Sequence, residues 1–174
     1  MRRFAVVALS VLIAFVVVAM ALPLFRGSRG SRINVCGSHV KSLALAMYMY
    51  ADDYDGHFPA SAAWCDALCA YVRDLDTFHC DKAPSLPCGY AYNSHMPTIS
   101  LKQLSDPGRT VVIFESARGW NAAGGIELLP SEPRHGGGDY YGFADGSARW
   151  VKRSEASALI WNPAPSPGPP GPGP

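Results

Sequence analysis

The chain has 174 residues, of which 15 are basic and 14 acidic, so its formal net charge is +1. That length leaves room for one modest domain, because single domains usually contain about 100–150 residues. The charge is close to neutral and no basic stripe is interleaved with aromatic residues, which argues against a nucleic-acid partner.

Residues 4–25 form an apolar run without any charge, and Ser10 is its one polar residue. A helix of that length spans roughly 30 Å, about the thickness of a bilayer's hydrocarbon core. Two interpretations are open, a retained anchor or a signal peptide cleaved after Ala-Met-Ala at 19–21; the length of the run favours the anchor. We therefore predict a cytoplasmic N-terminus (1–3), a transmembrane helix (4–25) and a flexible joint (26–32).

Five cysteines are many for a domain of this size, and they bear on the compartment. In an exported chain such a density favours disulfides, whereas in a cytosolic chain it favours metal binding or redox chemistry. Basic residues stand on both sides of the apolar run, so the positive-inside rule does not decide the orientation. On the cysteines we expect a single-pass inner-membrane protein whose bulk is periplasmic or extracellular.

The pairing of the cysteines is open from the sequence. A disulfide between Cys80 and Cys88 would close a short loop, whereas Cys65 and Cys69 are one helical turn apart, which is poor disulfide geometry. The alternative is a zinc site in which Cys65 and Cys69 join ligands from Cys80, Cys88, His79 or His95, although the spacing differs from paired Cys-x₂-Cys motifs. The odd number leaves at least one thiol free or paired between chains.

Apolar residues recur at steps of three and four from residue 33 to about 55, which predicts an amphipathic helix. A shorter helix is expected over 61–72, and the Pro and Gly residues within 78–93 predict a loop. The β-branched run 110–114 predicts a central strand, and 126–129 is a further strand candidate.

Residues 140–144 and 148–152 flank Asp145-Gly146, which predicts a hairpin because glycine takes the positive φ that the turn needs. Ser154 is a candidate cap for a last short helix that ends near residue 160. The tail 162–174 is almost entirely Pro and Gly and is expected to be disordered, which leaves 33–161 as the globular head. The fold class predicted from this order is α+β.

Several motifs, taken in order, resemble one family. His135 is followed after nine residues by Asp145-Gly146, and this pattern is similar to the C-terminal signature of pseudopilin-like proteins with a prepilin-type N-terminal region. Those proteins are related to the pilins of type II secretion. Segments that match the same family in order are 36–59, 78–80, 89–93 and 107–115. The resemblance covers roughly residues 1–153.

The resemblance implies a pilin-like fold, in which one long N-terminal helix (membrane span plus amphipathic half) packs on a small antiparallel sheet. It also implies a non-enzymatic structural or interaction role, linked to a type II secretion or type IV pilus-like apparatus. The partners expected on this basis are the membrane, other pilin-like subunits and secretion-system proteins. An alternative is a secreted or anchored binding protein that has the pilin-like head and no filament role.

The front of the chain departs from that family. Its prepilins carry Gly-Phe-Thr-Leu-Ile-Glu at the start of the apolar segment, whereas here Arg3 leads directly into Phe4-Ala-Val-Val. The glycine precedes the cleavage point and the glutamate pairs with a neighbouring subunit during assembly, and this chain has neither.

Two further hypotheses concern metal ions. His135 and Asp145 are candidate metal ligands, and a metal-dependent hydrolase built on them is a third function class, but the interpretation favoured by the sequence is a structural hairpin. Three aspartates within 52–55 suggest calcium, yet placing Gly56 at the sixth position of an EF-hand loop puts alanines at positions 1 and 12. We therefore expect no cofactor, with a non-EF calcium site in the head as the remaining option.

Overall fold

The computed structural model describes residues 35–164, which belong to the compact unit that begins at residue 35. The predicted transmembrane helix, the joint and most of the predicted disordered tail lie outside these residues. None of the helices within 35–164 combines the length and the apolar character that crossing a bilayer requires.

Helix α2 (Val35–Asp53) opens the described part and confirms the amphipathic helix that the periodicity predicts. Its buried side lies against the sheet and consists of Cys36, Val40, Leu43, Ala44, Ala46, Met47 and Ala51. The helix ends in a turn where Asp55 and Gly56 have φ of 56° and 92°, and the Gly56 amide donates to the Ala51 carbonyl over 2.6 Å. The acidic turn at 52–55 therefore terminates a helix.

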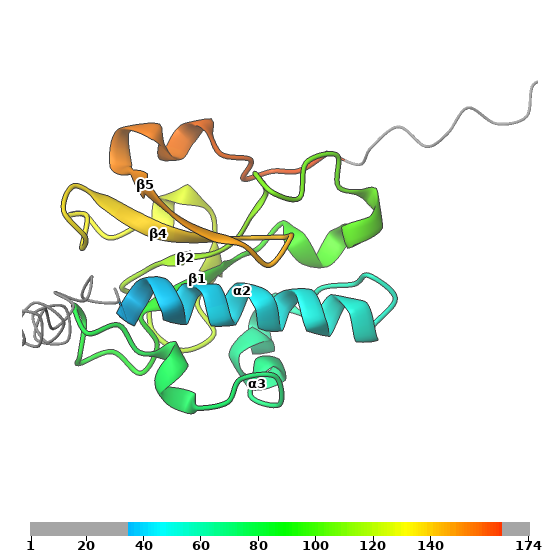
Figure 1. Cartoon of the computed structure of the whole chain (residues 1–174), viewed down its shortest axis with the longest axis horizontal. Helices are drawn as coiled ribbons and strands as arrows, with labels where there is room; N and C mark the ends of the chain where they lie inside the picture. The colour runs from blue at the N-terminus through cyan, green and yellow to red at the C-terminus, as the bar shows by residue number, and fades with distance from the viewer. Residues whose placement is uncertain (1–34, 165–174) are drawn as a thin grey trace, which may run out of the picture. The chain divides into compact units, whose positions relative to one another are not determined.

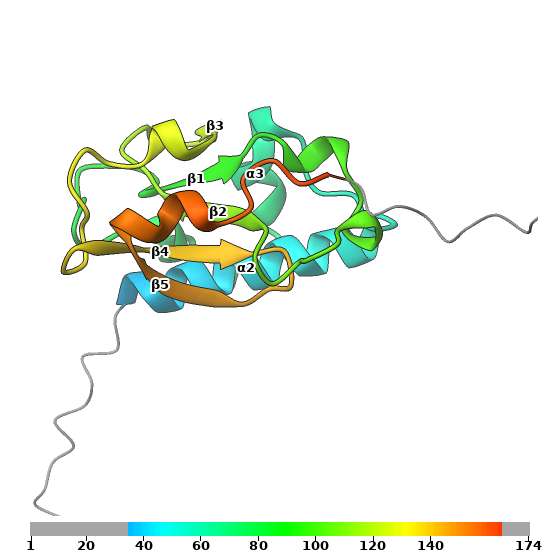
Figure 2. The same ribbon diagram turned by 90° about the horizontal axis from the view of Figure 1, so that it is seen from above.

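The sheet has five strands in the order β3-β1-β2-β4-β5. Its strands are β1 (Tyr90–Asn93), β2 (Val111–Glu115), β3 (Ala123–Gly124), β4 (Gly138–Phe143) and β5 (Ala148–Lys152). Neighbours are antiparallel except β1 and β3, which are parallel, so the sheet is not purely antiparallel. The predicted central strand and the predicted hairpin are both present (Figures 1 and 2). The molecule is thus a mixed α+β fold.

Two hydrophobic clusters fill the two sides of the sheet. One lies between the sheet and α2, and the other lies under the 3₁₀-helix Arg153–Ala158, which covers the opposite face (Figure 1). β2 contributes to both, since Val112 joins the first cluster and Phe114 the second. Burial on both faces explains why β2 is an unbroken apolar run.

Helix α2 comes very close to β4 at one glycine. A Cβ atom added at Gly142 would lie 2.8 Å from the Cβ of Ala44, a distance at which something must shift. Glycine therefore sets the spacing between this strand and the helix above it.

Several predicted elements differ from the structure. The segment predicted as a loop over 78–93 contains strand β1, whose residues are all buried, so the alternation that marks a strand is missing. Residues Ile126–Leu128 form a 3₁₀-helix, where a strand was predicted, because the Gly125 amide is held by the Glu127 side chain at 2.7 Å.

Two predicted helices are shorter than expected. Over 61–72 the structure has the 3₁₀-helix Ser61–Ala63 and helix α3 (Trp64–Leu68). The Cys69 amide is shared between the carbonyls of Cys65 and Asp66, a tightening typical of helix ends. The last predicted helix is the 3₁₀-helix Arg153–Ala158, with Lys152 and not Ser154 before its first turn.

Candidate functional site

The two halves of the His-x₉-Asp-Gly pattern lie at opposite ends of strand β4. His135 precedes the strand, and Asp145-Gly146 follows it in the hairpin turn. A six-residue strand spans about 20 Å, so the two side chains cannot share one metal ion or one reacting group. The metal site and the hydrolase that were considered for His135 with Asp145 therefore have no common location.

The Asp145 end is a tight turn. The Asp145 carboxylate accepts a hydrogen bond from the Ser147 amide at 2.8 Å, and Gly146 has φ of 76°. The Gly146 carbonyl accepts a hydrogen bond from Lys41 Nζ of helix α2 at 2.6 Å. These contacts give Asp145 and Gly146 a structural role in the hairpin and in its attachment to α2.

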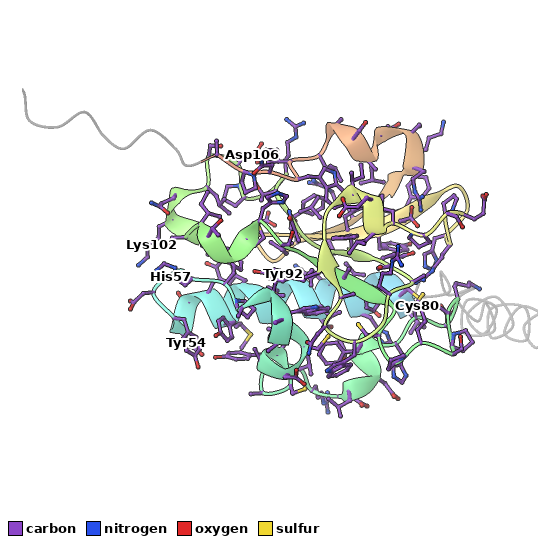
Figure 3. All side chains as sticks on the ribbon, turned by 180° about the vertical axis from the view of Figure 1, so that it is seen from behind. Tyr54, His57, Cys80, Tyr92, Lys102 and Asp106 are labelled. Carbon is purple, nitrogen blue, oxygen red and sulfur yellow. The ribbon has the colours of Figure 1, made fainter. Side chains whose placement is uncertain are left out.

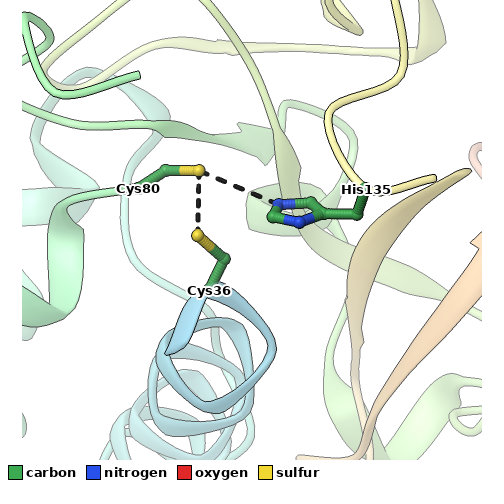
Figure 4. A group of neighbouring side chains, drawn as sticks. All are labelled: Cys36, Cys80 and His135. Carbon is green, nitrogen blue, oxygen red and sulfur yellow. Dashed lines mark hydrogen bonds between the residues drawn. The ribbon is translucent and has the colours of Figure 1, made fainter. Parts of the chain in front are cut away.

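The His135 end gathers reactive side chains from three segments (Figure 4). Cys36 Sγ, in the first turn of α2, lies 3.0 Å from Cys80 Sγ, in the loop that leads to β1. Cys80 Sγ lies 3.9 Å from His135 Nε2, and all three potential ligand atoms lie within 4.8 Å of one another. Within the described part of the chain, no other group of three or more His, Cys, Asp or Glu residues converges in this way.

A buried carboxyl group lies beside these three residues. Glu115, the last residue of β2, is fully buried, and its Oε1 lies 3.0 Å from His135 Nε2 and accepts from the Tyr140 amide at 3.1 Å. Its Oε2 is buried and has no hydrogen-bond partner among residues 35–164. Burial raises the pKa of Glu115 to about 9, which favours the protonated form of this carboxyl group in the metal-free chain.

The two thiols of this cluster are unequal. A hydrogen bond from the Cys36 thiol, acting against burial, lowers the pKa of Cys80 to about 5. The same hydrogen bond, together with burial, raises the pKa of Cys36. Cys36 Sγ also lies 2.7 Å from an oxygen of the exposed Asp81. The hydrogen bond therefore favours the thiolate form of Cys80 over that of Cys36, and such a pair is suited to binding a soft metal ion or to oxidation.

A surface hollow borders the cluster. It is lined in part by His39, His79, Cys80 and Asp81, at the loop that carries Cys80. Cys80 lies at the end of the head that is away from Tyr54 and His57, near the start of α2 (Figure 3). Cys80 itself is only 1% exposed, so its sulfur is shielded from bulky reagents.

A second pair of buried thiols lies elsewhere in the core. Cys65 Sγ lies 4.0 Å from Cys88 Sγ, and Cys69 is exposed. The Asn121 side chain accepts from the Cys65 amide at 2.8 Å, and the Asn121 amide donates to Cys65 Sγ at 3.3 Å. The predicted disulfide between Cys80 and Cys88 is not what the structure shows, because Cys80 contacts Cys36, Cys88 contacts Cys65, and all five cysteines are free thiols.

The zinc site considered for the pair Cys65 and Cys69 is likewise not assembled, since the converging group in the described residues uses Cys36, Cys80 and His135. The aspartates at 52–55 do not converge either; Asp53 accepts from the Tyr71 hydroxyl at 2.8 Å. The reasoning from sequence missed Glu115 and the partnership of Cys36 with Cys80. The available signal was a charged residue at the end of an otherwise apolar strand.

No family model matches the sequence, and neither the curated proteins nor the solved structures include a significant match to it.

Proposed function

We propose that the chain is a membrane-anchored, pilin-like structural and interaction protein that has no enzymatic activity. Residues 4–25 hold it in the cytoplasmic membrane, and the head faces outward and acts through contacts with pilin-like subunits or components of a secretion apparatus. The observation that carries this proposal is the position of α2. The helix begins just after the predicted joint and lies along one face of a mainly antiparallel sheet.

The outer side of α2 supports a role in protein contacts. Leu45, Tyr48 and Met49 recur at three- and four-residue steps, and they are 45%, 39% and 45% exposed. Apolar side chains that share one exposed side of a helix are typical of surfaces that meet a partner. The other side of the same helix is buried against the sheet, so the stalk helix offers this stripe without disturbing the core.

One sequence feature supports a second candidate function, that of an anchored binding protein. The glycine and glutamate used for processing and assembly by the similar prepilins are missing here, which favours an anchored binding protein that does not build filaments. A hydrolase based on His135 and Asp145 is disfavoured, because these residues are separated by the length of β4.

Labelling of Cys69 tests the orientation of the head. Cys69 is the exposed cysteine and the other four are buried, so a membrane-impermeant maleimide should react with it selectively. In spheroplasts that make the full-length chain we expect labelling without lysis, and no labelling of the matched variant Cys69→Ser. Labelling that requires lysis would place the head in the cytoplasm and contradict the proposal.

Extraction and mass measurement test the anchor. The full-length chain should stay in the membrane pellet after an alkaline wash, and its intact mass should correspond to a start at Met1 or Arg2. A protein that begins at Leu22 and appears in the soluble fraction would show that residues 4–25 are a cleaved signal peptide. Cross-linking through Tyr48→Cys in a Cys69→Ser background, compared with the exposed position Asp76→Cys off this helix, would distinguish ordered subunits from isolated anchored heads.

A further inference from the structure

We propose that Cys36, Cys80, His135 and Glu115 form a binding site for one divalent transition-metal ion of the zinc type. The site is independent of the proposed anchoring and contact role, and it does not include the cysteines whose spacing first suggested zinc. Each ligand comes from a different segment: the start of α2, the loop before β1, the loop before β4 and the end of β2.

The spacing of the donor atoms fits such an ion. Zinc ligands lie about 2.0–2.3 Å from the metal, so two ligands of a tetrahedral site are about 3.3–3.8 Å apart. Here Cys36 Sγ and Cys80 Sγ are 3.0 Å apart, and Cys80 Sγ and His135 Nε2 are 3.9 Å apart. Cys36 Sγ and His135 Nε2 lie within 4.8 Å of each other, so shifts of about 1 Å would bring the three atoms around one centre. Imidazole and thiolate ligands also favour zinc over harder cations such as magnesium and calcium, which prefer oxygen ligands.

The buried Glu115 points independently to a cation. Its carboxyl group has no exposed surface, and Oε2 has no hydrogen-bond partner in the described part of the chain. A buried carboxyl oxygen left without a partner is costly, and a bound cation beside it removes that cost. Oε1 lies 3.0 Å from the same His135 nitrogen that faces Cys80. The donors that already lie within 4.8 Å of one another are those of Cys36, Cys80 and His135, so Glu115 would join them by a movement of its carboxyl group.

The surrounding charge supports binding. Metal binding would release the protons of Cys36 and Glu115. Two thiolates and a carboxylate around a divalent ion then leave one negative charge, and the Arg134 guanidinium acts on both Cys80 and Glu115. Arg134 is held in place by hydrogen bonds to the carbonyls of Gly89 and Ser116, at 2.9 and 2.8 Å. A surface hollow lined in part by Cys80 borders the site.

With Glu115 drawn in beside the three converging donors, the site would have four protein ligands and be closed, which is the pattern of structural and not catalytic zinc. The ion would fasten the first turn of α2 to two loops and to β2 at one end of the head. Metal binding would then contribute to folding of the head.

The alternative to metal binding is oxidation of the thiols of Cys36 and Cys80. A disulfide between Cys36 and Cys80 would form with release of two protons and two electrons to a thiol-oxidising partner. It would use neither the His135 nitrogen nor the orphaned Glu115 oxygen. The metal site accounts for all four groups, and we therefore favour it.

The test uses the reduced full-length chain, loaded with Zn²⁺ and then with Co²⁺ as a spectroscopic probe. We expect one equivalent of metal per chain by elemental analysis, and a sulfur-to-cobalt charge-transfer band with the intense visible bands of tetrahedral cobalt. Cys80→Ser and His135→Gln should each lose the stoichiometric metal, and Glu115→Gln should weaken binding by about 10–100-fold. The matched control Cys65→Ser/Cys88→Ser, which alters the other buried thiol pair, should retain the metal and the band.

Circular dichroism of each variant separates loss of metal from loss of fold. If Cys80→Ser does not fold, titration of the wild-type apoprotein with Co²⁺, read by the sulfur charge-transfer band, decides the matter. Absence of that band in the reduced wild-type chain, or equal metal loss in the control variant, would overturn the proposal. So would isolation of the native protein with Cys36 and Cys80 joined in a disulfide and without metal.

Discussion

The two ends of strand β4 attach the sheet to helix α2 by different means. At the His135 end, the contacts join segments far apart in the chain: Cys36 and Cys80 are 44 residues apart, and Cys80 and His135 are 55 apart. At the Asp145 end, most contacts lie within the turn itself, and a single lysine of α2 reaches across to it. The first end is buried and chemically reactive, whereas the second is a tight turn held by local geometry.

The two ends of the His-x₉-Asp-Gly pattern have different roles: His135 belongs to a buried cluster, and Asp145-Gly146 forms a hairpin turn. The nine residues between His135 and Asp145 include the whole of β4 and the short segments on either side of it. The two ends therefore meet α2 at separate places and do not form a common site. If this is right, substitutions at the two ends should differ in cost and in kind, with the greatest loss of stability at the buried His135 end.

Replacement of His135 by alanine should have the largest effect. It removes the side-chain partner of the buried Glu115 carboxyl group, which keeps the Tyr140 amide, and should lower the free energy of unfolding of the metal-free chain by roughly 2–4 kcal/mol. Denaturant unfolding measures this. The double variant His135→Ala/Glu115→Met should recover part of the loss, because the second change removes the stranded carboxyl group. Equal losses in the single and double variants would contradict the assignment.

Substitution of Gly142, near the Asp145 end of β4, should come next. Gly142→Ala places a Cβ atom 2.8 Å from that of Ala44 and should cost about 1–3 kcal/mol through overpacking between the strand and α2. The control is Ala44→Gly, which costs about 1 kcal/mol on its own because glycine is unfavourable inside a helix. Combined with Gly142→Ala it should relieve the clash, so the two changes should be clearly non-additive. Simple additivity would mean that this contact does not set the helix–sheet spacing.

The same contrast explains which parts of the molecule were predictable from the sequence. The hairpin at Asp145-Gly146 is specified by adjacent residues, and α2 by its apolar periodicity; both are confirmed. Strand β1 was missed because burial on both faces removes the alternating pattern, and local side-chain bonding at Gly125 turned a predicted strand into a 3₁₀-helix.

The cluster around Cys80 could not be predicted because it depends on pairing across the sheet. β1, β2 and β4 must be in register before Glu115 and His135 meet. The spacing of cysteines in the chain instead suggested Cys80 with Cys88, which are close in sequence. In the structure Cys80 meets a thiol 44 residues away.

At the other end of β4, Gly146→Ala should cost about 1–2 kcal/mol. Gly146 has φ of 76°, a conformation that L-residues with a Cβ atom adopt only with strain. Gly146→Asn is the matched control, because asparagine tolerates this conformation better, and it should lose less stability. Thermal unfolding of the two variants side by side measures the difference. Equal destabilisation would point to crowding against Leu45 and Tyr48 of α2 in place of backbone strain.

Asp145→Ala should have the smallest effect, since it removes one exposed hydrogen bond between the carboxylate and the Ser147 amide. A loss of about 0.5–1 kcal/mol is expected, and Asp145→Asn should nearly restore the wild-type value because an asparagine oxygen accepts the same bond. The sharper readout is cobalt binding at the far end of β4, which Asp145→Ala should leave unchanged while His135→Gln abolishes it. Loss of cobalt in both variants would show that the two ends of the strand act as one site, and the separation on which the comparison rests would then be wrong.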